Sequence, residues 1–366
     1  MKKVCFVLGT RPEIIKLSPV IRECERKDIP FFIIHTNQHY SSEMDGSFFQ
    51  ELHLPKPTYN LDIHETLHGR MVGRMLESIE RVLLKENPSL VFVQGDTNTV
   101  LAGGLASAKL QIPVGHVEAG LRSYDRTMPE EINRVLVDHV SDYLFCPTQK
   151  QADIALGEGI EKKKIYVTGN TVVDAVQQNI QRAEQDMRYS HYKKEKYMLL
   201  TMHRPSNVDN PDTLRQIVEA LYTVSRDQEK KIYFPIHPRT IQALQRAKIV
   251  LDSACIVQMA PFQYLEMLVA QKYAHLILTD SGGVQEEACI LKTPCVTIRN
   301  TTERPETVEV GANVVAGVTK NGILQAVQKI ESVSKDWTNP FGNGDAAEKI
   351  IDAVLPHLSS LSHLPR

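Results

Sequence analysis

The chain has 366 residues, of which 42% are hydrophobic and 23% are charged. A chain of this length is predicted to form two domains, each able to bury a core without disulfides or a structural metal. Its 42 basic and 44 acidic residues leave a formal charge of -2, which argues against a dedicated nucleic-acid-binding protein, because such proteins usually carry a strong basic excess.

The N-terminal segment and the cysteines indicate a cytoplasmic protein. The first apolar stretch ends at Gly9 and is only about five residues long, shorter than the apolar core of a signal peptide. No apolar run reaches the roughly 18 residues that a membrane-spanning helix needs. The six cysteines are scattered without a CxxC pair, so we expect reduced core thiols, and neither disulfides nor a metal site.

Short apolar runs alternate with amphipathic stretches along the first half of the chain. This pattern predicts βαβ units, and hence a parallel sheet covered by helices on both faces. Strands are predicted at 4–9, 31–36, 90–96, 113–118, 143–148 and 164–170. Helices are predicted at about 12–27, 67–86, 98–110, 131–141, 148–158 and 171–187.

The polar stretch 185–196 is predicted to be a linker, after which the same alternation restarts. Strands are predicted at 197–203, 231–237, 255–259, 275–280 and 294–299, and helices at about 210–226, 238–247, 261–272, 283–291 and 320–333. A last helical pattern at about 344–357 fits packing on either half. The chain is therefore predicted to consist of two α/β halves of similar size.

Nearly every predicted strand ends in an ionisable residue. In open α/β sheets ligands bind beyond the carboxyl ends of the strands, so these residues are candidates for a binding site. They are Arg11, His35, Asp96, Glu118, His203, His237, Asp280 and Arg299.

The segment that starts at Asp280 and reads DSGGVQEEA is the sharpest of these candidates. Gly282 and Gly283 let a ligand approach the backbone, and the N–H groups at a helix start favour an anion. Together with the acidic residues that follow, this favours a nucleotide diphosphate, with Glu287 reaching the ribose. The alternative is an ordinary helix start with Ser281 as its N-cap. The segment is neither a P-loop nor a GxGxxG dinucleotide motif.

The opening VLGTRPEIIK is a second candidate for a phosphate site, with Arg11 and Lys16 near a helix start. Solvated surface cations are the alternative there. Two further alternatives are a helix cap at Asp96 and an ion pair between Glu118 and Arg122. Taken together, the cations and helix starts suit a pyrophosphate, and the carboxylates and histidines suit proton transfer, as a nucleotide-diphosphate sugar requires.

Eight motifs carry a resemblance to a known family. GTRPE, GDT, HVEAGLR, PEEINR, GNT, a T-x-H-R segment, DSGGVQEEA and TTERPE occur in the order seen in non-hydrolysing UDP-N-acetylglucosamine 2-epimerases, from Gly9 to about Gly344. The resemblance implies two Rossmann-like domains of the glycosyltransferase-B type facing across a cleft. Residues 1–187 would form the N-terminal domain, joined by a crossing-back C-terminal helix at 344–366, and 188–343 the UDP-binding domain.

The resemblance also implies an activity. The family interconverts UDP-N-acetylglucosamine and UDP-N-acetylmannosamine by eliminating UDP to 2-acetamidoglucal and re-adding it, for polysaccharide and cell-envelope pathways. No cofactor and no metal are expected, and the partners are the two UDP sugars and a second copy of the chain, without nucleic acid or membrane insertion. Which carboxylate removes the C2 proton stays open.

The site residues follow from the matched motifs. The resemblance implies that the catalytic residues are Asp96, Glu118, Glu130 and His203. It implies that the substrate and UDP contacts are Arg11, Lys16, Arg134, His237, Met267, Ser281, Gly282, Gly283, Glu287 and Arg304.

The chain departs from many bacterial members at Ser206 and Ser41, next to Gln38 and His39. In those members the corresponding residues help form an allosteric UDP-N-acetylglucosamine site, so we expect different regulation. Four other functions remain open: a 2-epimerase of another UDP sugar, a hydrolysing epimerase, a glycosyltransferase of the same fold, and a regulatory nucleotide-sugar binder.

Overall fold

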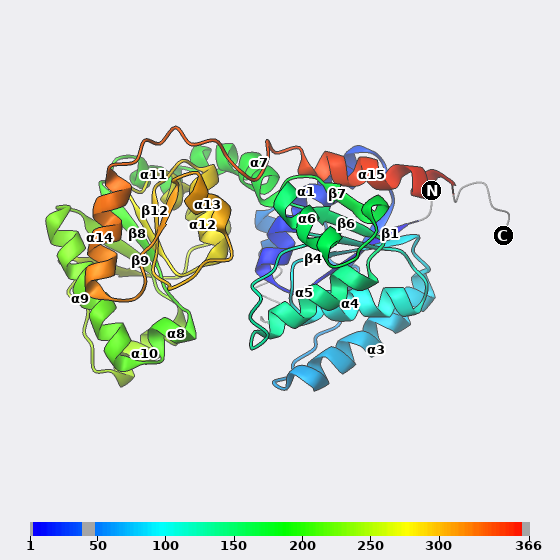
Figure 1. The fold of residues 1–366 in the computed structure, drawn as a ribbon, viewed down its shortest axis with the longest axis horizontal. Coiled ribbons are helices and arrows are strands. Elements are labelled where there is room, and N and C mark those ends of the chain that lie inside the picture. The colour runs from blue at the N-terminus through cyan, green and yellow to red at the C-terminus, as the bar shows by residue number, and fades with distance from the viewer. Residues whose placement is uncertain (1–2, 39–47, 361–366) are drawn as a thin grey trace. The chain divides into compact units, whose positions relative to one another are not determined.

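The computed structural model describes residues 3–38 and 48–360, which fall into two compact units (Figure 1). The first unit comprises the described residues up to Gln177 and from Phe341 onward, and the second comprises Gln178–Pro340. Ser41 and His39 lie outside the described residues.

The stretch expected to be a linker is folded. The units divide within helix α7 (Thr171–Gln185), ahead of the predicted boundary at 187. The residues that follow form a 3-10 helix, η2 (Met187–Lys193), whose Tyr192 is buried and donates a hydrogen bond to Glu266 (2.9 Å). The expectation of a linker is wrong because two tyrosines in this polar stretch pack into the second unit.

A seven-stranded parallel sheet forms the centre of the first unit, counted over the described residues. Its order is β3-β2-β1-β4-β5-β6-β7, which extends the doubly wound order of Rossmann folds. The strands are β1 (Val4–Leu8), β2 (Phe31–His35), β3 (Tyr59–Asn60), β4 (Leu90–Gln94), β5 (Val114–Val117), β6 (Tyr143–Cys146) and β7 (Ile165–Val167). Only β3 was not predicted, because two residues give no periodicity.

Amphipathic helices cover this sheet. They are α1 (Arg11–Arg26), α3 (His68–Glu86), α4 (Asn98–Lys109), α5 (Pro129–Val140), α6 (Gln149–Gly157) and α15 (Ala346–Ser360), with the short η1 (Lys162–Lys164). Alternate residues of the buried strands, such as Val7 and Val93, pack with Met75, Val100 and Val137 of α3, α4 and α5. Helix α15 lies along α1 (Figure 1), so the last helix belongs to the first unit.

The second unit repeats this plan. Over the described residues its parallel sheet has six strands in the order β10-β9-β8-β11-β12-β13. The strands are β8 (Tyr197–Thr201), β9 (Lys231–Pro235), β10 (Ile256–Met259), β11 (Ile277–Thr279), β12 (Cys295–Thr297) and β13 (Asn313–Val315). The helices are α8 (Pro205–Val208), α9 (Pro211–Asp227), α10 (Pro238–Arg246), α11 (Tyr264–Tyr273), α12 (Gly282–Ile290), α13 (Pro305–Glu309) and α14 (Lys320–Glu331). The predictions missed β13, α8 and α13, which are too short to show a period.

Strands β4 and β5 end two residues and one residue earlier than predicted, so that the carboxylate-bearing residue expected at the end of each strand lies outside it. Strand β4 ends at Gln94 because Gly95 has φ 83°, and β5 ends at Val117 because Glu118 has φ 68°. Both values leave the extended region of backbone conformation. Asp96 and Glu118 therefore lie beyond the sheet, at its carboxyl edge.

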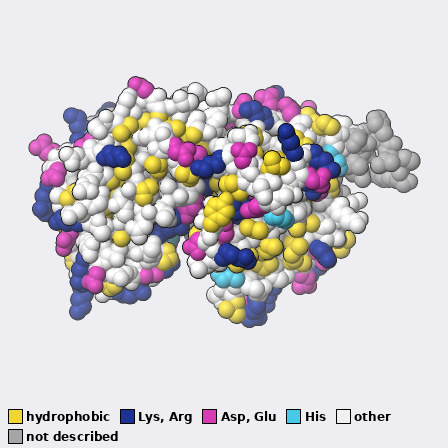
Figure 2. All heavy atoms as spheres, viewed as in Figure 1, with side chains coloured by type: hydrophobic (Ala, Val, Ile, Leu, Met, Phe, Trp, Pro, Cys, Tyr) yellow, Lys and Arg dark blue, Asp and Glu magenta, His cyan; other side chains and the backbone are white. Residues whose placement is uncertain are grey.

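The face of the molecule drawn in Figure 2 is not predominantly basic. Lysine and arginine side chains are interspersed with aspartate and glutamate over the face drawn in Figure 2. Among the described residues, no helix has the length and apolar character needed to cross a membrane. The six cysteines are buried free thiols, as expected.

A buried carboxylate in α7 receives the start of α15. Asp174 accepts hydrogen bonds from the backbone N–H groups of Ala347 (2.9 Å) and Ala346 (3.3 Å). Burial raises the pKa of Asp174 to about 6, because its effect outweighs that of these hydrogen bonds. Ionised Asp174 therefore costs folding free energy while it caps the helix.

This cost predicts a pH dependence. Because the folded-state pKa lies above the unfolded value, the cost is absent below about pH 4, grows through about pH 6 and is complete above it. We expect the stability of the wild-type chain relative to Asp174→Asn to fall by about 2 kcal/mol between about pH 4 and pH 7. Denaturant unfolding of both proteins measures this. A stability difference that does not change with pH would contradict the prediction.

Candidate active site

Each unit has a topological switch point, where neighbouring strands are followed by connections that run in opposite directions. These points lie between β1 and β4 in the first sheet and between β8 and β11 in the second. Ligands of doubly wound sheets bind at such points. The segments that follow these strands are therefore the first places to look for a site.

Glu118 is held in a buried ion pair just beyond β5. The Lys16 ammonium lies 2.8 and 2.7 Å from its two carboxylate oxygens, and the Gln94 amide also donates to it. Lys16 and Glu118 are only 7% and 6% exposed, so each charge depends on the other. The left-handed backbone at Glu118 is costly for a residue other than glycine, and such strain concentrates at functional sites.

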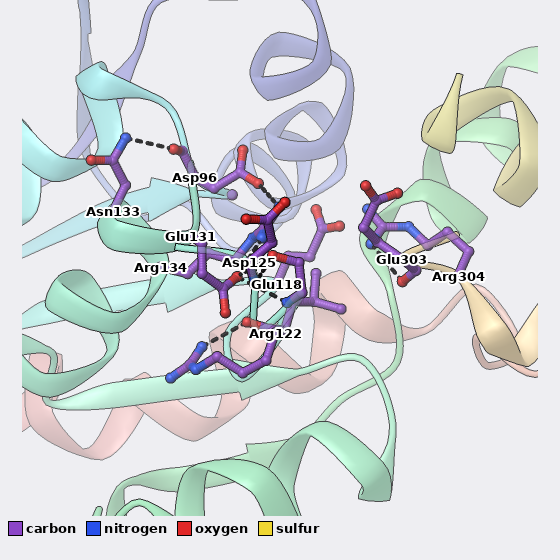
Figure 3. A network of polar contacts seen from close by, with 12 residues as sticks. Asp96, Glu118, Arg122, Asp125, Glu131, Asn133, Arg134, Glu303 and Arg304 are labelled. Atoms are coloured by element: carbon purple, nitrogen blue, oxygen red, sulfur yellow. Dashed lines mark hydrogen bonds and ion pairs between the residues drawn. The ribbon is translucent and has the colours of Figure 1, made fainter. Parts of the chain in front are cut away.

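Arg134 forms a second set of paired charges at the same edge, which Figure 3 shows beside Glu118. One nitrogen of its guanidinium donates to Asp96 (2.5 Å) and another donates to Glu131 (2.7 Å). The backbone carbonyl of Asp96 also accepts a hydrogen bond from the Asn133 amide (2.8 Å). Asp96, which is half-buried, is thereby fixed by two residues of α5.

The two glutamates that begin α5 differ in their surroundings. Glu131 is buried and accepts hydrogen bonds from the N–H groups of Ser123 and Tyr124 (both 2.9 Å). Burial would raise the pKa of Glu131, but these hydrogen bonds and Arg134 bring it below its usual value. Glu130, the predicted catalytic residue, is exposed on this turn.

The loop after β1 brings a cation and a buried acid to the switch point. Arg11 lies over the Phe48 ring, 4.4 Å from its centroid. Glu13 accepts hydrogen bonds from Gly9 N (2.6 Å) and from the Thr97 hydroxyl, next to Asp96. Burial raises the pKa of Glu13 to about 7. Sequence reasoning missed Glu13, although the T-x-x-E spacing of a capping box was a signal for it.

The suggested ion pair between Glu118 and Arg122 does not form. Arg122 instead donates to Asp138 (2.7 Å) and to Glu158 (2.8 and 2.6 Å), because Lys16 already occupies both oxygens of Glu118. Asp138 was also missed. It follows Glu131 by seven residues and so falls on the same buried face of α5, a spacing visible in the sequence.

The alternative of a helix cap next to Asp96 is confirmed in part. Thr97 is the N-cap of α4, and its hydroxyl accepts a hydrogen bond from Val100 N (3.4 Å). The carboxylate of Asp96 is left for Arg134. Thr97 thus caps the helix, while the adjacent Asp96 pairs with Arg134.

In the second unit, the start of α12 is open. Ser281 is the N-cap residue, but its side chain makes no capping hydrogen bond. A Cβ atom added to Gly282 or Gly283 would meet no heavy atom within 4 Å, and neither residue has a positive φ. Neither packing among the described residues nor backbone conformation requires glycine here. The exposed N–H groups suit an anion.

Asp280 organises the other side of this switch point. It is fully buried and accepts hydrogen bonds from the backbone N–H groups of His203 (3.0 Å) and Arg204 (2.8 Å). The His203 ring is half-exposed, with its centroid 6.0 Å from that of His237. Burial and the neighbouring His203 lower the pKa of His237, whose Nδ1 caps α10 by accepting from Arg239 N (3.1 Å).

Charged side chains surround the body of α12. Arg304 lies 2.7 Å from Glu286, and Glu303, drawn with it in Figure 3, forms two 2.7 Å hydrogen bonds with Arg299. Burial opposes ionisation of Glu303, but Arg299 lowers its pKa to about 2. Glu287 is buried and accepts from the Gln271 amide (2.6 Å).

Met267 lies apart from these charges, in the first turn of α11. It is half-buried. The described residues contain no group of three or more His, Cys, Asp or Glu side chains arranged to hold a metal ion.

Comparison with known proteins identifies the family. The sequence profile of UDP-N-acetylglucosamine 2-epimerases matches residues 22–355. The chain belongs to this family. This epimerase-family chain is 54% identical over 357 residues to the UDP-N-acetylglucosamine 2-epimerase of Methanocaldococcus jannaschii, covering 95% of this chain and 98% of the relative.

One solved structure and one further relative bear on the site. A crystal structure of the Methanocaldococcus jannaschii enzyme in complex with UDP-GlcNAc and UDP is similar with a TM-score of 0.90 and 53% identity, covering 96% of this chain and 99% of that one. A UDP-2,3-diacetamido-2,3-dideoxy-D-glucuronate 2-epimerase of Pseudomonas aeruginosa is 42% identical, covering 96% and 98%. The two Rossmann-like domains of this epimerase-family chain are of the glycosyltransferase-B type, as predicted.

The buried pair of Lys16 and Glu118 predicts a stability effect. Lys16→Met leaves the carboxylate without its cation and should lower the free energy of unfolding by about 3 kcal/mol. The double variant Lys16→Met with Glu118→Gln should recover part of this loss. As a control, Lys163→Met breaks an exposed pair with Glu161 and should cost less than about 0.5 kcal/mol. Denaturant unfolding measures all three, and equal effects of Lys16→Met and Lys163→Met would contradict the prediction.

Proposed function

We propose that the chain is a non-hydrolysing epimerase that interconverts UDP-N-acetylglucosamine and UDP-N-acetylmannosamine. The observation that carries this proposal is the presence of two fixed carboxylates, Glu118 and Asp96, at the switch point of the first sheet. Family membership supports it independently. A cytoplasmic homodimer, acting in polysaccharide synthesis, is part of the same proposal.

The proposed route avoids a difficult deprotonation. The hydrogen on C2 of the sugar is not next to a carbonyl group, so direct removal would give an unstabilised carbanion. Instead, a base takes the C2 proton as the bond from C1 to UDP breaks. The electron pair of the former C2–H bond then forms the C1–C2 double bond. UDP then adds back to C1 as a proton reaches C2 from the opposite face. No oxidant, reductant or cofactor is consumed.

The first unit supplies the proton chemistry in this proposal. Removal and return of a proton on opposite faces of the sugar call for an acid–base group on each face. Glu118 and Asp96, with Glu130 or the neighbouring Glu131, are the candidates. Lys16 and Arg134 keep the first two carboxylates in place through direct hydrogen bonds. Such fixed placement lowers the cost of reaching the reactive geometry.

The second unit is proposed to hold UDP. The N–H groups at Ser281, Gly282 and Gly283 would bind the diphosphate at the start of α12, where charge develops as UDP leaves. Arg304 and His203 would stabilise that charge. The remaining contacts proposed for this unit are Glu287 with the ribose, Met267 near the uracil and His237 with the diphosphate. Arg11, in the first unit, is a further proposed substrate contact.

Solvent deuterium provides the first test. In heavy water, UDP-N-acetylglucosamine should acquire deuterium at C2 as UDP-N-acetylmannosamine appears, measured by NMR. Asp96→Asn and Glu118→Gln should each reduce this exchange by about 100-fold or more, since each removes an acid–base group. Turnover with full retention of the C2 hydrogen would contradict the elimination.

The same reaction mixtures separate the other functions. A hydrolysing epimerase would accumulate UDP and free sugar in equal amounts. A glycosyltransferase would leave UDP-N-acetylglucosamine unchanged without an acceptor, and a regulatory binder would cause no exchange at all. Near-normal exchange in both carboxylate variants would show that the site is wrongly assigned.

The open glycines give a second prediction. Gly282→Ala adds a Cβ that meets no protein atom, so the fold should be unharmed and gain up to about 1 kcal/mol of stability. The same Cβ would occupy space needed by the diphosphate, and the Kd for UDP should rise about tenfold. Gly157→Ala in α6 is the matched control, since its added Cβ also meets nothing. Calorimetric titration with UDP that gives equal Kd values for both variants would contradict the assignment.

The relative from Pseudomonas aeruginosa supports a second candidate substrate. This relative is 42% identical, and the substrate in its name is a UDP-diacetamido uronic acid. The same elimination would apply there, because the chemistry involves only C1 and C2. We expect UDP-N-acetylglucosamine to have the highest kcat/KM in a panel of UDP sugars. A higher value for the uronic acid would favour the second candidate.

A further inference from the structure

We propose that Asp138 and His116 are positioning residues that set Glu118 and Asp96 in place together. This inference rests on the proposed function, since it concerns how that reaction's carboxylates are aligned. Neither residue lies among the groups assigned to the substrate above. Their contacts join the loop that carries Glu118 to the loop that carries Asp96.

Asp138 binds the Glu118 loop at three points. It is fully buried in α5, forms a 2.7 Å contact with His116 Nδ1, and accepts hydrogen bonds from Gly120 N (3.1 Å) and Arg122 Nη1 (2.7 Å). These partners lie two residues before, two after and four after Glu118. The HVEAGLR motif thus has one carboxylate as the common partner of its histidine, its glycine and its arginine.

His116 extends this connection to the second carboxylate. Its Nε2 lies 2.8 Å from the carbonyl oxygen of Gly95, the residue directly before Asp96. A carbonyl oxygen only accepts, so Nε2 is the donor in this contact, and Nδ1 lies 2.7 Å from an oxygen of Asp138. The pKa of Asp138 lies below its usual value despite its burial, because His116 and Arg122 favour the carboxylate. The ring is therefore fixed at both nitrogens.

The backbone of both loops makes such fixation necessary. Glu118 has φ 68°, Gly120 has φ 79° and Gly95 has φ 83°. A non-glycine residue in this conformation costs about 1–3 kcal/mol and persists only where its surroundings hold it. Without the contacts to Asp138, Glu118 would be free to relax, and its carboxylate would move relative to Asp96.

The close packing at Gly120 leaves the loop that carries Glu118 little room for another conformation. A Cβ at this position would lie 2.4 Å from the carbonyl oxygen of Gln151, so the segment passes closely against α6. The loop is thus confined by α6 on one side and by Asp138 of α5 on the other. Lys16 completes the arrangement by binding the carboxylate itself.

The test is a split between kcat and KM. Asp138→Asn should lower kcat for C2 exchange by about 100-fold while KM changes by less than about threefold, because misplacement affects the reaction more than binding. His116→Gln keeps a side-chain N–H near the position of Nε2. It should retain about tenfold more kcat than His116→Ala, a rescue that general loss of stability would not produce.

Asp174→Asn is the matched control, since it also removes a buried carboxylate from the first unit, and it should leave kcat unchanged. If the wild type shows exchange but kcat is unchanged in Asp138→Asn and in both His116 variants, this inference is overturned while the proposed function stands. Absence of exchange in the wild type would overturn the proposed function and this inference with it. If Asp138→Asn does not fold, the comparison of kcat between His116→Gln and His116→Ala tests the inference by itself.

Discussion

The arrangement of the first unit depends on how it pairs the buried charges at the carboxyl edge of its sheet. A carboxylate removed from water is tolerated only with a cation or several hydrogen-bond donors beside it. Glu118 has Lys16 and Gln94, and Glu131 has Arg134 and two backbone N–H groups. These pairs connect α1, β4 and α5 around one point. Carboxylates that we propose to transfer protons are thereby fixed by the same interactions that join the helices to the sheet.

The second unit differs from the first, because the anion site that we propose at the start of α12 has to stay open for a ligand. Asp280 is buried and already satisfied by backbone donors, so it shapes the loop without competing for the ligand. Ser281 does not cap its own helix, and the glycines after it face open space among the described residues. The unit thus leaves donors available at the start of α12, where the proposed reaction needs them for a leaving diphosphate.

Most helices and strands could be predicted from the sequence, but the partners of the buried charged side chains could not. Long periodic strands and helices were placed correctly, whereas β3, β13, α8 and α13 were too short to show a period. Strand ends at 94 and 117 depended on single positive φ values, which hydrophobic periodicity does not encode. Buried partners such as Asp138 were missed because their role depends on tertiary contacts. Asp96, Glu118, His203 and Ser281, which belong to motifs that the resemblance identified, lie just beyond the carboxyl ends of strands, as expected from the fold.

The proposed elimination requires that the bond between C1 and UDP breaks and re-forms during each epimerisation. Positional isotope exchange tests it most directly, with labelled oxygen placed in the bridge between C1 and the β-phosphorus. Reversible elimination predicts that the label appears in the non-bridging oxygens of the β-phosphate of recovered UDP-N-acetylglucosamine. Label that stays in the bridge while UDP-N-acetylmannosamine accumulates would contradict the proposed elimination.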